Sequence, residues 1–386
     1  MYRTALKTKI LIPVFLLASF IQAQNYDWKR YDSLVVAGVN QIYGIKFSEA
    51  EKTFTIVEKE FSQHPAGKFF KAMITWWQIA VELENESLDK HFYSQLEEVI
   101  DICDDMLDKN PKNADAMFFK GGALGFRGRL LAIRESWFDA AMDGKEGLNL
   151  IIKSYKINPQ NVDTQLGFGI YHYYADVIPK KYPVVKPFMV FFPQGDKSRG
   201  IRELENVAYN GRYAKIEARY FLMTIFFSFE NDSDNTIKYL ELLLKDFPDN
   251  PIFERYYGAA LYKKQDYTKA ESVFRNILSK AEKNYFGYNI RARREANYYI
   301  GNNFKNKDIP DSARYYFEKS EKFSRELDKK KPSGYLQNLV LYLGMIYDEL
   351  GMRDKAVKYY NEVLEMKERE NSHTLAKQYL KTPFKK

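Results

Sequence analysis

The chain has 386 residues, of which 45% are hydrophobic and 28% are charged, and it contains 30 Tyr and 28 Phe. This composition excludes intrinsic disorder and provides enough apolar material for a large core. The formal net charge of +8 is a mild basic excess for this length, so we expect no nucleic-acid partner. The single cysteine, Cys103, cannot form an internal disulfide, so stability must come from packing.

The N-terminus has the order of a secretory signal, with basic residues followed by an apolar stretch and a polar segment. Arg3, Lys7 and Lys9 precede the 12 mainly apolar residues of 10–21. Such a stretch is too short to span a bilayer, which requires about 17 to 25 residues. We therefore expect residues 1–23 to be a cleaved signal peptide.

Removal of this signal takes away three basic residues and no acidic ones, so the formal charge falls from +8 to +5. The end of the stretch, FIQAQ, resembles the signals of exported proteins from Bacteroidetes-like bacteria. This resemblance implies a periplasmic or envelope-associated protein of a Gram-negative bacterium. An uncleaved signal that tethers the chain to the membrane, or a buried first helix, is the alternative.

Three segments in the C-terminal half repeat one pattern of small and aromatic residues. They are built around Gly258, Gly301 and Gly344, and in each an alanine follows 12 residues later and an aromatic residue four residues after it. The alanines and aromatic residues are Ala270, Ala313, Ala356, Phe274, Phe317 and Tyr360. Small residues let two helices approach closely, and the aromatic ring fills the remaining space. The segments are therefore one helix–turn–helix unit that occurs three times.

This pattern resembles the tetratricopeptide repeat, although the glycines are 43 residues apart because the connectors are long. The resemblance implies an all-α solenoid, a right-handed superhelix of about eight helix pairs. After the signal, we expect irregular pairs over 24–210 and more regular repeats over 211–386. Residues 114–225 are similar to uncharacterised bacterial tetratricopeptide proteins, and this similarity brings no catalytic motif.

A long apolar segment, which includes PVVKPFMVFFP, interrupts the repeats. We expect helices over 163–176 and 196–210, with a loop over 177–195 between them, because four prolines forbid a continuous helix. The loop either packs onto the array as a plug or stays exposed as a contact for a partner or a membrane surface. In the exposed case, Phe188 and Phe191 are candidate contact residues.

The usual catalytic and metal-binding motifs are missing from the sequence. It has no GxSxG, HExxH, Walker-type or GxGxxG pattern, and its four histidines are far apart. The acidic stretch DICDDMLD lacks a loop that could wrap a cation, so a solvated helix face is the simpler interpretation. We therefore expect no enzymatic activity, no cofactor and no metal site.

Stacked tetratricopeptide pairs would line a concave groove with the first helix of each pair. Counting from the glycines, the side chains expected to face the groove in two repeats are Arg255, Tyr262, Lys263, Tyr298, Asn302 and Lys305, and in the third Leu341, Met345 and Asp348. The family's clamp for C-terminal carboxylates needs Lys and Asn at set positions; Asn302 fits, whereas Tyr298 stands where the lysine should be. Arginine forks and tyrosine faces suit an extended segment with acidic or aromatic character.

These features predict an exported, non-enzymatic scaffold that binds a protein or peptide partner in its concave groove. The chain's own tail, KQYLKTPFKK, is an alternative occupant of the groove. A carrier or sensor of an apolar small molecule, enclosed by the superhelix and covered by the loop 177–195, is the alternative function. An enclosed apolar cavity would favour the carrier, and an open groove lined by Arg and Tyr would favour the scaffold.

Overall fold

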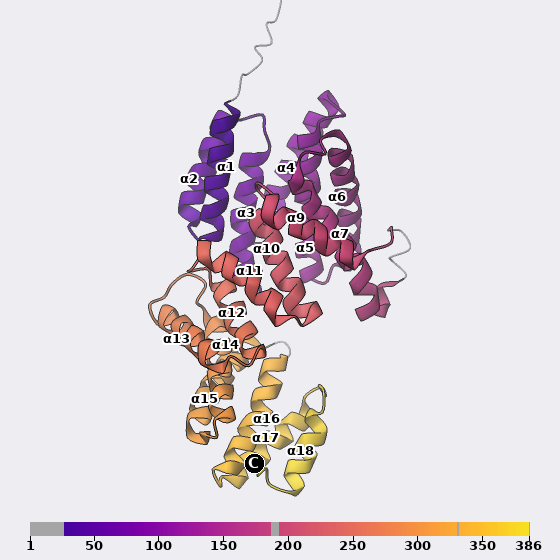
Figure 1. Cartoon of the computed structure of the whole chain (residues 1–386). Coiled ribbons are helices and arrows are strands. Elements are labelled where there is room, and N and C mark those ends of the chain that lie inside the picture. Colours follow the sequence, from indigo (N-terminus) through magenta and orange to yellow (C-terminus); the bar gives the residue numbers. More distant parts are fainter. Residues whose placement is uncertain (1–26, 187–192, 330–331, 386) are drawn as a thin grey trace, which may run out of the picture.

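The computed structural model describes residues 27–186, 193–329 and 332–385, and these form helices and connecting turns only (Figure 1). In these ranges, seventeen α-helices make up eight consecutive pairs and a final single helix, so the prediction of an all-α solenoid of about eight pairs is confirmed. The predicted signal peptide, residues 1–23, lies outside the described residues.

The helices pair in chain order, and the first helices of neighbouring pairs touch at α1–α3, α3–α5, α12–α14 and α14–α16. The pairs are α1 (Trp28–Tyr43) with α2 (Phe47–Glu60), α3 (Ala66–Val81) with α4 (Asp89–Lys109), α5 (Ala114–Ile133) with α6 (Trp137–Ile157), α7 (Gln165–Lys181) with α9 (Lys197–Asn210), α10 (Lys215–Ile225) with α11 (Ser233–Asp246), α12 (Pro251–Lys263) with α13 (Tyr267–Glu282), α14 (Ile290–Asn306) with α15 (Pro310–Leu327), and α16 (Gly334–Glu349) with α17 (Arg353–Glu365). The single helix α18 (Ser372–Lys381) ends the array, and the short elements are η1 (Val162–Thr164), η2 (Pro183–Val185) and the π-helical turn η3 (Phe226–Glu230).

Close packing within the last regular pairs depends on a glycine in the first helix and an aromatic ring in the second. A Cβ atom added to Gly258, Gly301 or Gly344 would lie 2.7, 2.5 or 2.6 Å from the nearest ring atom of Phe274, Phe317 or Tyr360, respectively. The alanines of the pattern, Ala270, Ala313 and Ala356, are at most 1% exposed. The predicted spacing of small and aromatic residues therefore describes real contacts between paired helices.

We expect Gly301→Ala to lower the free energy of unfolding by about 1 to 3 kcal/mol, because the added methyl group overlaps the fully buried ring of Phe317. At a helix position without such an overlap, a change from glycine to alanine stabilises the folded state by about 1 kcal/mol. Gly125→Ala in α5 is the matched control, because nothing lies within 4 Å of its added Cβ atom. Urea denaturation should show opposite signs for the two variants, and a common sign would contradict the packing described.

Helix α7 continues beyond the point predicted from the sequence. We expected a loop over 177–195, but α7 extends to Lys181 and includes Pro179. That prediction was wrong because a proline near the end of a helix removes few of the helix's backbone hydrogen bonds. The N–H of Tyr182 still donates to the carbonyl of Ile178 at 2.8 Å.

The remainder of the apolar segment is described only in part. Residues 187–192, which include Phe188 and Phe191, lie outside the described residues, so the plug and the docking surface both stay predictions. The following helix begins as expected, since the side chain of Asp196 accepts a hydrogen bond from the N–H of Arg199 at 2.9 Å and caps α9.

The first pairs fold back onto the middle of the chain (Figure 1). The side-chain amide of Asn250, which precedes α12, donates to the carbonyl of Tyr43 at the end of α1 at 2.9 Å. Asp32 of α1 forms an ion pair with Arg212, which lies just before α10. One buried core consequently runs from α1 to α14, and a second core lies within α15–α18.

Side chains fill much of the space inside this folded-back part. Twelve of the 16 residues of α3 are buried, as expected for a helix that packs on two sides. Arg129 of α5 donates to Glu217 of α10 at 2.9 Å, and its guanidinium carbon lies 4.7 Å from the ring centres of Trp76 and Phe221. The inner face of the first pairs is therefore largely packed.

His64 lies between α2 and α3 in an aromatic surrounding. Its ring centre is 4.9 Å from that of Tyr31 and 5.2 Å from that of Phe119, and its Nδ1 atom accepts the N–H of Ala66 at 3.2 Å. Burial lowers the pKa of His64 to about 4. The folded protein therefore holds a neutral imidazole at pH values where an unfolded chain would protonate it.

The depressed pKa of His64 predicts that stability falls as the pH is lowered. An unfolded histidine binds a proton below about pH 6.5, whereas the folded one does so only near pH 4, so acid favours unfolding between these values. Between about pH 7.5 and pH 5, this difference amounts to about 2 kcal/mol. Urea denaturation at both pH values should show a smaller decrease in the free energy of unfolding for His64→Gln than for the parent. A His91→Gln variant, changed at an exposed histidine, should show the same decrease as the parent.

Candidate functional site

Tyrosines from the first helices of five pairs form a strip on the inner side of the solenoid, which we call the tyrosine strip. Its members are Tyr174 of α7, Tyr220 of α10, Tyr256 and Tyr262 of α12, Tyr298 and Tyr299 of α14, and Tyr335 and Tyr342 of α16. Neighbouring helices bring these rings together. The ring centres of Tyr262 and Tyr299 are 5.1 Å apart, and Tyr298 lies 5.1 Å from Tyr335 and 6.5 Å from Tyr342.

Each tyrosine of the strip is partly exposed, yet burial raises its pKa, to about 12 for Tyr174 and Tyr299. Side chains that are crowded but still reach solvent are expected on the floor of a concave surface. Burial is also the main cause of the raised pKa of Tyr256, followed by the electrostatic effect of Tyr220, with a smaller effect from Tyr174. These electrostatic effects indicate that the phenols of α7, α10 and α12 lie near one another.

Two hydroxyl groups of the strip lack a hydrogen-bond partner within the described part of the chain. The hydroxyls of Tyr174 and Tyr256 make no hydrogen bond with another described residue. Neither hydroxyl oxygen belongs to the buried atoms that lack a partner. By contrast, the hydroxyl of Tyr262 accepts a hydrogen bond from Asn306 at 3.3 Å. A protonated phenol is a hydrogen-bond donor, so Tyr174 and Tyr256 offer free donors to a ligand.

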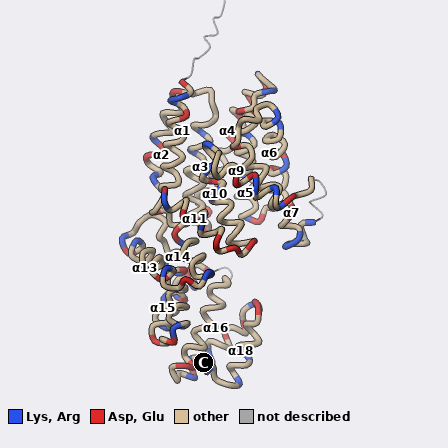
Figure 2. Tube along the Cα trace, viewed as in Figure 1, with Lys and Arg blue, Asp and Glu red and all other residues tan. Residues whose placement is uncertain are grey.

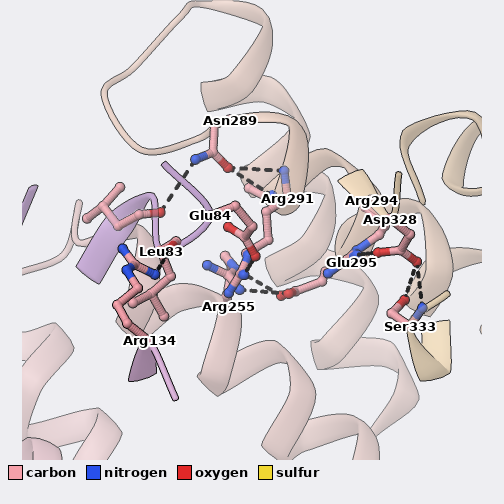
Figure 3. Close-up of polar contacts among 12 residues, drawn as sticks. Leu83, Glu84, Arg134, Arg255, Asn289, Arg291, Arg294, Glu295, Asp328 and Ser333 are labelled. Carbon is pink, nitrogen blue, oxygen red and sulfur yellow. Dashed lines mark hydrogen bonds and ion pairs between the residues drawn. The ribbon is translucent and has the colours of Figure 1, made fainter. Parts of the chain in front are cut away.

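Arg255, one of the predicted groove residues, lies beside the strip and is paired with Glu295 (Figure 3). The two side chains form a double hydrogen bond, with Nε to Oε2 at 2.7 Å and Nη2 to Oε1 at 2.6 Å. Burial opposes ionisation of Glu295, but the charge and hydrogen bonds of Arg255 outweigh it, so the pKa of Glu295 is lowered. The guanidinium fork of Arg255 is therefore already occupied by a carboxylate of the same chain.

Two neighbouring arginines of α14 are paired with carboxylates as well. Arg294 reaches Asp328 at 3.3 Å, and Arg291 forms an ion pair with Glu84 from the turn after α3 (Figure 3). Burial lowers the pKa of Arg291. The Nε atoms of both arginines are buried without an acceptor, but each guanidinium group has its own carboxylate. The arginines beside the strip therefore present no unbalanced charge.

The other predicted groove residues have different surroundings. Lys263 donates to the carbonyl of Phe227 in η3 at 3.0 Å and lies 4.0 Å from the centre of that ring, and burial lowers its pKa. Lys305 lies 4.9 Å from the ring centre of Tyr342 at the far end of the strip. Asn302 is only 5% exposed. Lys305 is thus beside the strip, whereas Lys263 ties α12 to the preceding pair.

The amide of Asn302 is used within its own helix, because its Nδ2 atom donates to the carbonyl of Tyr298 at 2.9 Å. In the last regular pair, Leu341 is 5% exposed, and Asp348 accepts hydrogen bonds from Arg353 at 2.9 Å and from the N–H of Phe384 at 2.8 Å. The C-terminal tail, as far as the structure describes it, therefore packs at the end of α16 and not along the tyrosine strip.

Several members of the strip were not identified from the sequence, although one signal was present. Tyr256, Tyr299 and Tyr342 each stand two residues before the repeat glycine, in YYG, YYIG and YLG. We counted the groove from the residue three before the glycine, which gave Arg255, Tyr298 and Leu341. Tyr174 and Tyr220 come from irregular pairs that lack this glycine spacing, so only the structure places them beside the others.

A hollow of about 600 Å³ lies between α1, η1 and the turn from α9 to α10. Its walls carry polar side chains such as Asn161, Asp163 and Lys215 together with the apolar or aromatic side chains of Val36, Val162 and Tyr213. The hollow therefore has a mixed polar and apolar lining. In the view of Figure 2, basic and acidic residues are intermixed along the helices.

Within the described ranges, no group of three or more His, Cys, Asp or Glu residues is arranged to hold a metal ion. In the same ranges, none of the helices combines the length and the apolar character needed to cross a bilayer.

The tetratricopeptide repeat family matches residues 339–366, which contain the repeat residues Gly344, Ala356 and Tyr360. A search of curated protein sequences finds no match to the chain. The family match and the sequence resemblance thus agree on the same kind of repeat, and the packing of its glycine against Tyr360 is the one expected from the pattern.

Solved structures that match the chain include bacterial and yeast proteins. One is the C-terminal part of a TPR repeat-containing protein from Cytophaga hutchinsonii, with 14% identity and a TM-score of 0.37, covering 80% of this chain and 98% of that chain. Another is a tetratricopeptide repeat protein from Parabacteroides merdae, with 10% identity and a TM-score of 0.35, covering 81% and 99%. Yeast Tom70 matches with 12% identity and a TM-score of 0.39, covering 92% and 82%. The repeat assignment rests on the family match and on the packing of the glycines.

Proposed function

We propose that this chain, a tetratricopeptide-repeat protein, is an exported scaffold that binds an extended segment of a partner protein along its tyrosine strip. The observation that carries the proposal is the strip itself: eight partly exposed tyrosines on the first helices of consecutive pairs. Tyrosine is favoured at binding surfaces because it offers a large apolar face and a polar end at a low cost in conformational entropy.

The length of the strip suits an extended ligand. It crosses five helices from α7 to α16, whereas a compact small molecule would contact only one or two of them. The free hydroxyls of Tyr174 and Tyr256 can donate to backbone carbonyls of such a segment.

The chemistry of the strip supports binding and not catalysis. A raised pKa keeps the phenols of Tyr174 and Tyr299 protonated at neutral pH, so they are poor nucleophiles and poor bases. The arginines beside them are held by carboxylates, which leaves no free fork to stabilise a developing anion. We therefore propose a non-enzymatic role.

Selection from a library of random peptides of roughly 12 residues, long enough to cross about four inner helices, tests the proposal directly. We expect the mature chain to enrich peptides that bind at least about tenfold more weakly to the double variant Tyr256→Ala/Tyr262→Ala. The control is Tyr315→Ala on the outer helix α15, where the side chain is 51% exposed. Thermal unfolding should first show that both variants are folded.

Two results of this selection would contradict the proposal. One is the absence of any enriched peptide. The other is enrichment of peptides that bind the folded inner-face variant as tightly as they bind the parent protein.

Export is the second part of the proposal, and it is supported by the basic, apolar and polar order of residues 1–23. We expect mass spectrometry of natively expressed protein to find an N-terminus near Gln24 or Asn25. A chain that lacks residues 1–23 should stay in the cytosol. Recovery of the full-length chain from the cytosol with Met1 in place would contradict export.

A further inference from the structure

The charges beside the tyrosine strip indicate what kind of segment the strip selects. Arg255, Arg291 and Arg294 all have carboxylate partners within the chain. An acidic ligand would have to displace Glu295 from the double hydrogen bond of Arg255, which would leave a buried carboxylate unpaired. These arginines therefore offer no free guanidinium group to an acidic segment, whereas the rings and hydroxyls of the strip suit a neutral one.

The spacing of the tyrosines provides a second observation. Tyr256, Tyr299 and Tyr342 occupy equivalent positions in three consecutive repeats, so each inner helix adds one ring in the same place. Packed helices lie about 8 to 10 Å apart. A polyproline II helix rises about 3.1 Å per residue and has three residues per turn, so one of its turns covers about 9 Å. One turn of such a helix thus matches the step from one inner helix to the next.

The relative angles of the rings provide a third observation. The ring planes of Tyr298 and Tyr299 differ by 84°, and those of Tyr298 and Tyr335 by 83°. Tyr298 and Tyr342 are closer to parallel, with an angle of 25°. The strip is therefore an aromatic surface with rings in mixed orientations, and proline-rich ligands dock on aromatic-lined surfaces.

The free hydroxyls of the strip also suit a proline-rich segment. The hydroxyls of Tyr174 and Tyr256 have no acceptor in the described part of the chain. A proline-rich segment has no internal hydrogen bonds, so its carbonyls are free acceptors, and its prolines bring no N–H groups that would need a partner. Phenol donors and carbonyl acceptors therefore satisfy one another without any charged group.

We infer that the tyrosine strip binds a proline-rich, uncharged segment of a partner protein in the polyproline II conformation, with about one turn of the ligand for each inner helix. This inference rests on the proposed function, because it names the ligand class of the same surface. The partner is defined by its chemistry as a chain with an exposed run of prolines.

Fluorescence anisotropy with a labelled peptide of roughly nine prolines, about three turns, tests the inference on the mature full-length chain. We expect this peptide to bind more tightly than a Gly-Ser peptide or a Glu-Gly peptide of the same length. Its affinity should change by less than about twofold when the salt concentration is raised, because no ion pair is formed. Maltoheptaose, a neutral oligosaccharide, should not displace it.

Removal of single hydroxyls gives the matched variants. Tyr256→Phe keeps the ring and deletes only the donor, so we expect the oligoproline affinity to fall about fivefold, as for the loss of one hydrogen bond. Tyr315→Phe on the outer helix α15 removes a hydroxyl away from the strip and should leave the affinity unchanged. A folded Tyr256→Phe variant that binds oligoproline like the parent would overturn the inference.

The remaining outcomes separate this inference from the proposed function. Tighter, salt-sensitive binding of the Glu-Gly peptide, or equal binding of the Gly-Ser peptide, would overturn the inference. If the random-peptide selection still yields ligands that depend on Tyr256 and Tyr262, the proposed function stands. Displacement of oligoproline by maltoheptaose, together with the failure of that selection, would overturn both.

Discussion

Two asparagines hold the structure together by acting at two helix ends at once. Asn250 and Asn289 cap the starts of α12 and α14, where their side-chain oxygens accept backbone N–H groups. Their side-chain nitrogens donate to the carbonyls of Tyr43 and Val81, the last residues of α1 and α3, at 2.9 and 3.5 Å. An aspartate would cap the same helices but has no donor for the second contact. Unpaired groups at the ends of four helices are thus satisfied across the solenoid.

The first pairs also have a packed inner face. There, Arg129 of α5 is held between the rings of Trp76 in α3 and Phe221 in α10. The turn after α3 also supplies Glu84 to Arg291, and Arg134 of α5 donates to the carbonyl of Leu83 at 2.8 Å (Figure 3). The N-terminal pairs therefore build one wall of the site, although the tyrosine strip comes from later helices.

The sequence predicts the regular part of the fold because its signals are local. The step from Gly301 to Ala313 and then to Phe317 is read within a single repeat, and the structure shows the glycine packed against that ring. The contacts from Asn250 to Tyr43 and from Arg129 to Glu217 join residues far apart in the chain, and no spacing rule indicates them. For the candidate site, counting gave residues on α12, α14 and α16, which also carry part of the tyrosine strip. The carboxylate partner of Arg255 was not foreseen, and neither were the irregular helices that carry Tyr174 and Tyr220.

The asparagine contacts also affect the order in which the chain can fold. A linear repeat array gains stability from each neighbour as it is added, so its folding can spread along the chain from almost any unit. Here the asparagines and the carbonyls that they contact are separated by 207 and 208 residues along the chain. During synthesis, the carbonyls at the ends of α1 and α3 are therefore made long before their hydrogen-bond donors. Bringing such distant segments together lowers the conformational entropy of the chain before any favourable contact between them forms. The part of the chain from α1 to α14 should therefore mature as one slow unit, onto which the separate core of α15–α18 stacks.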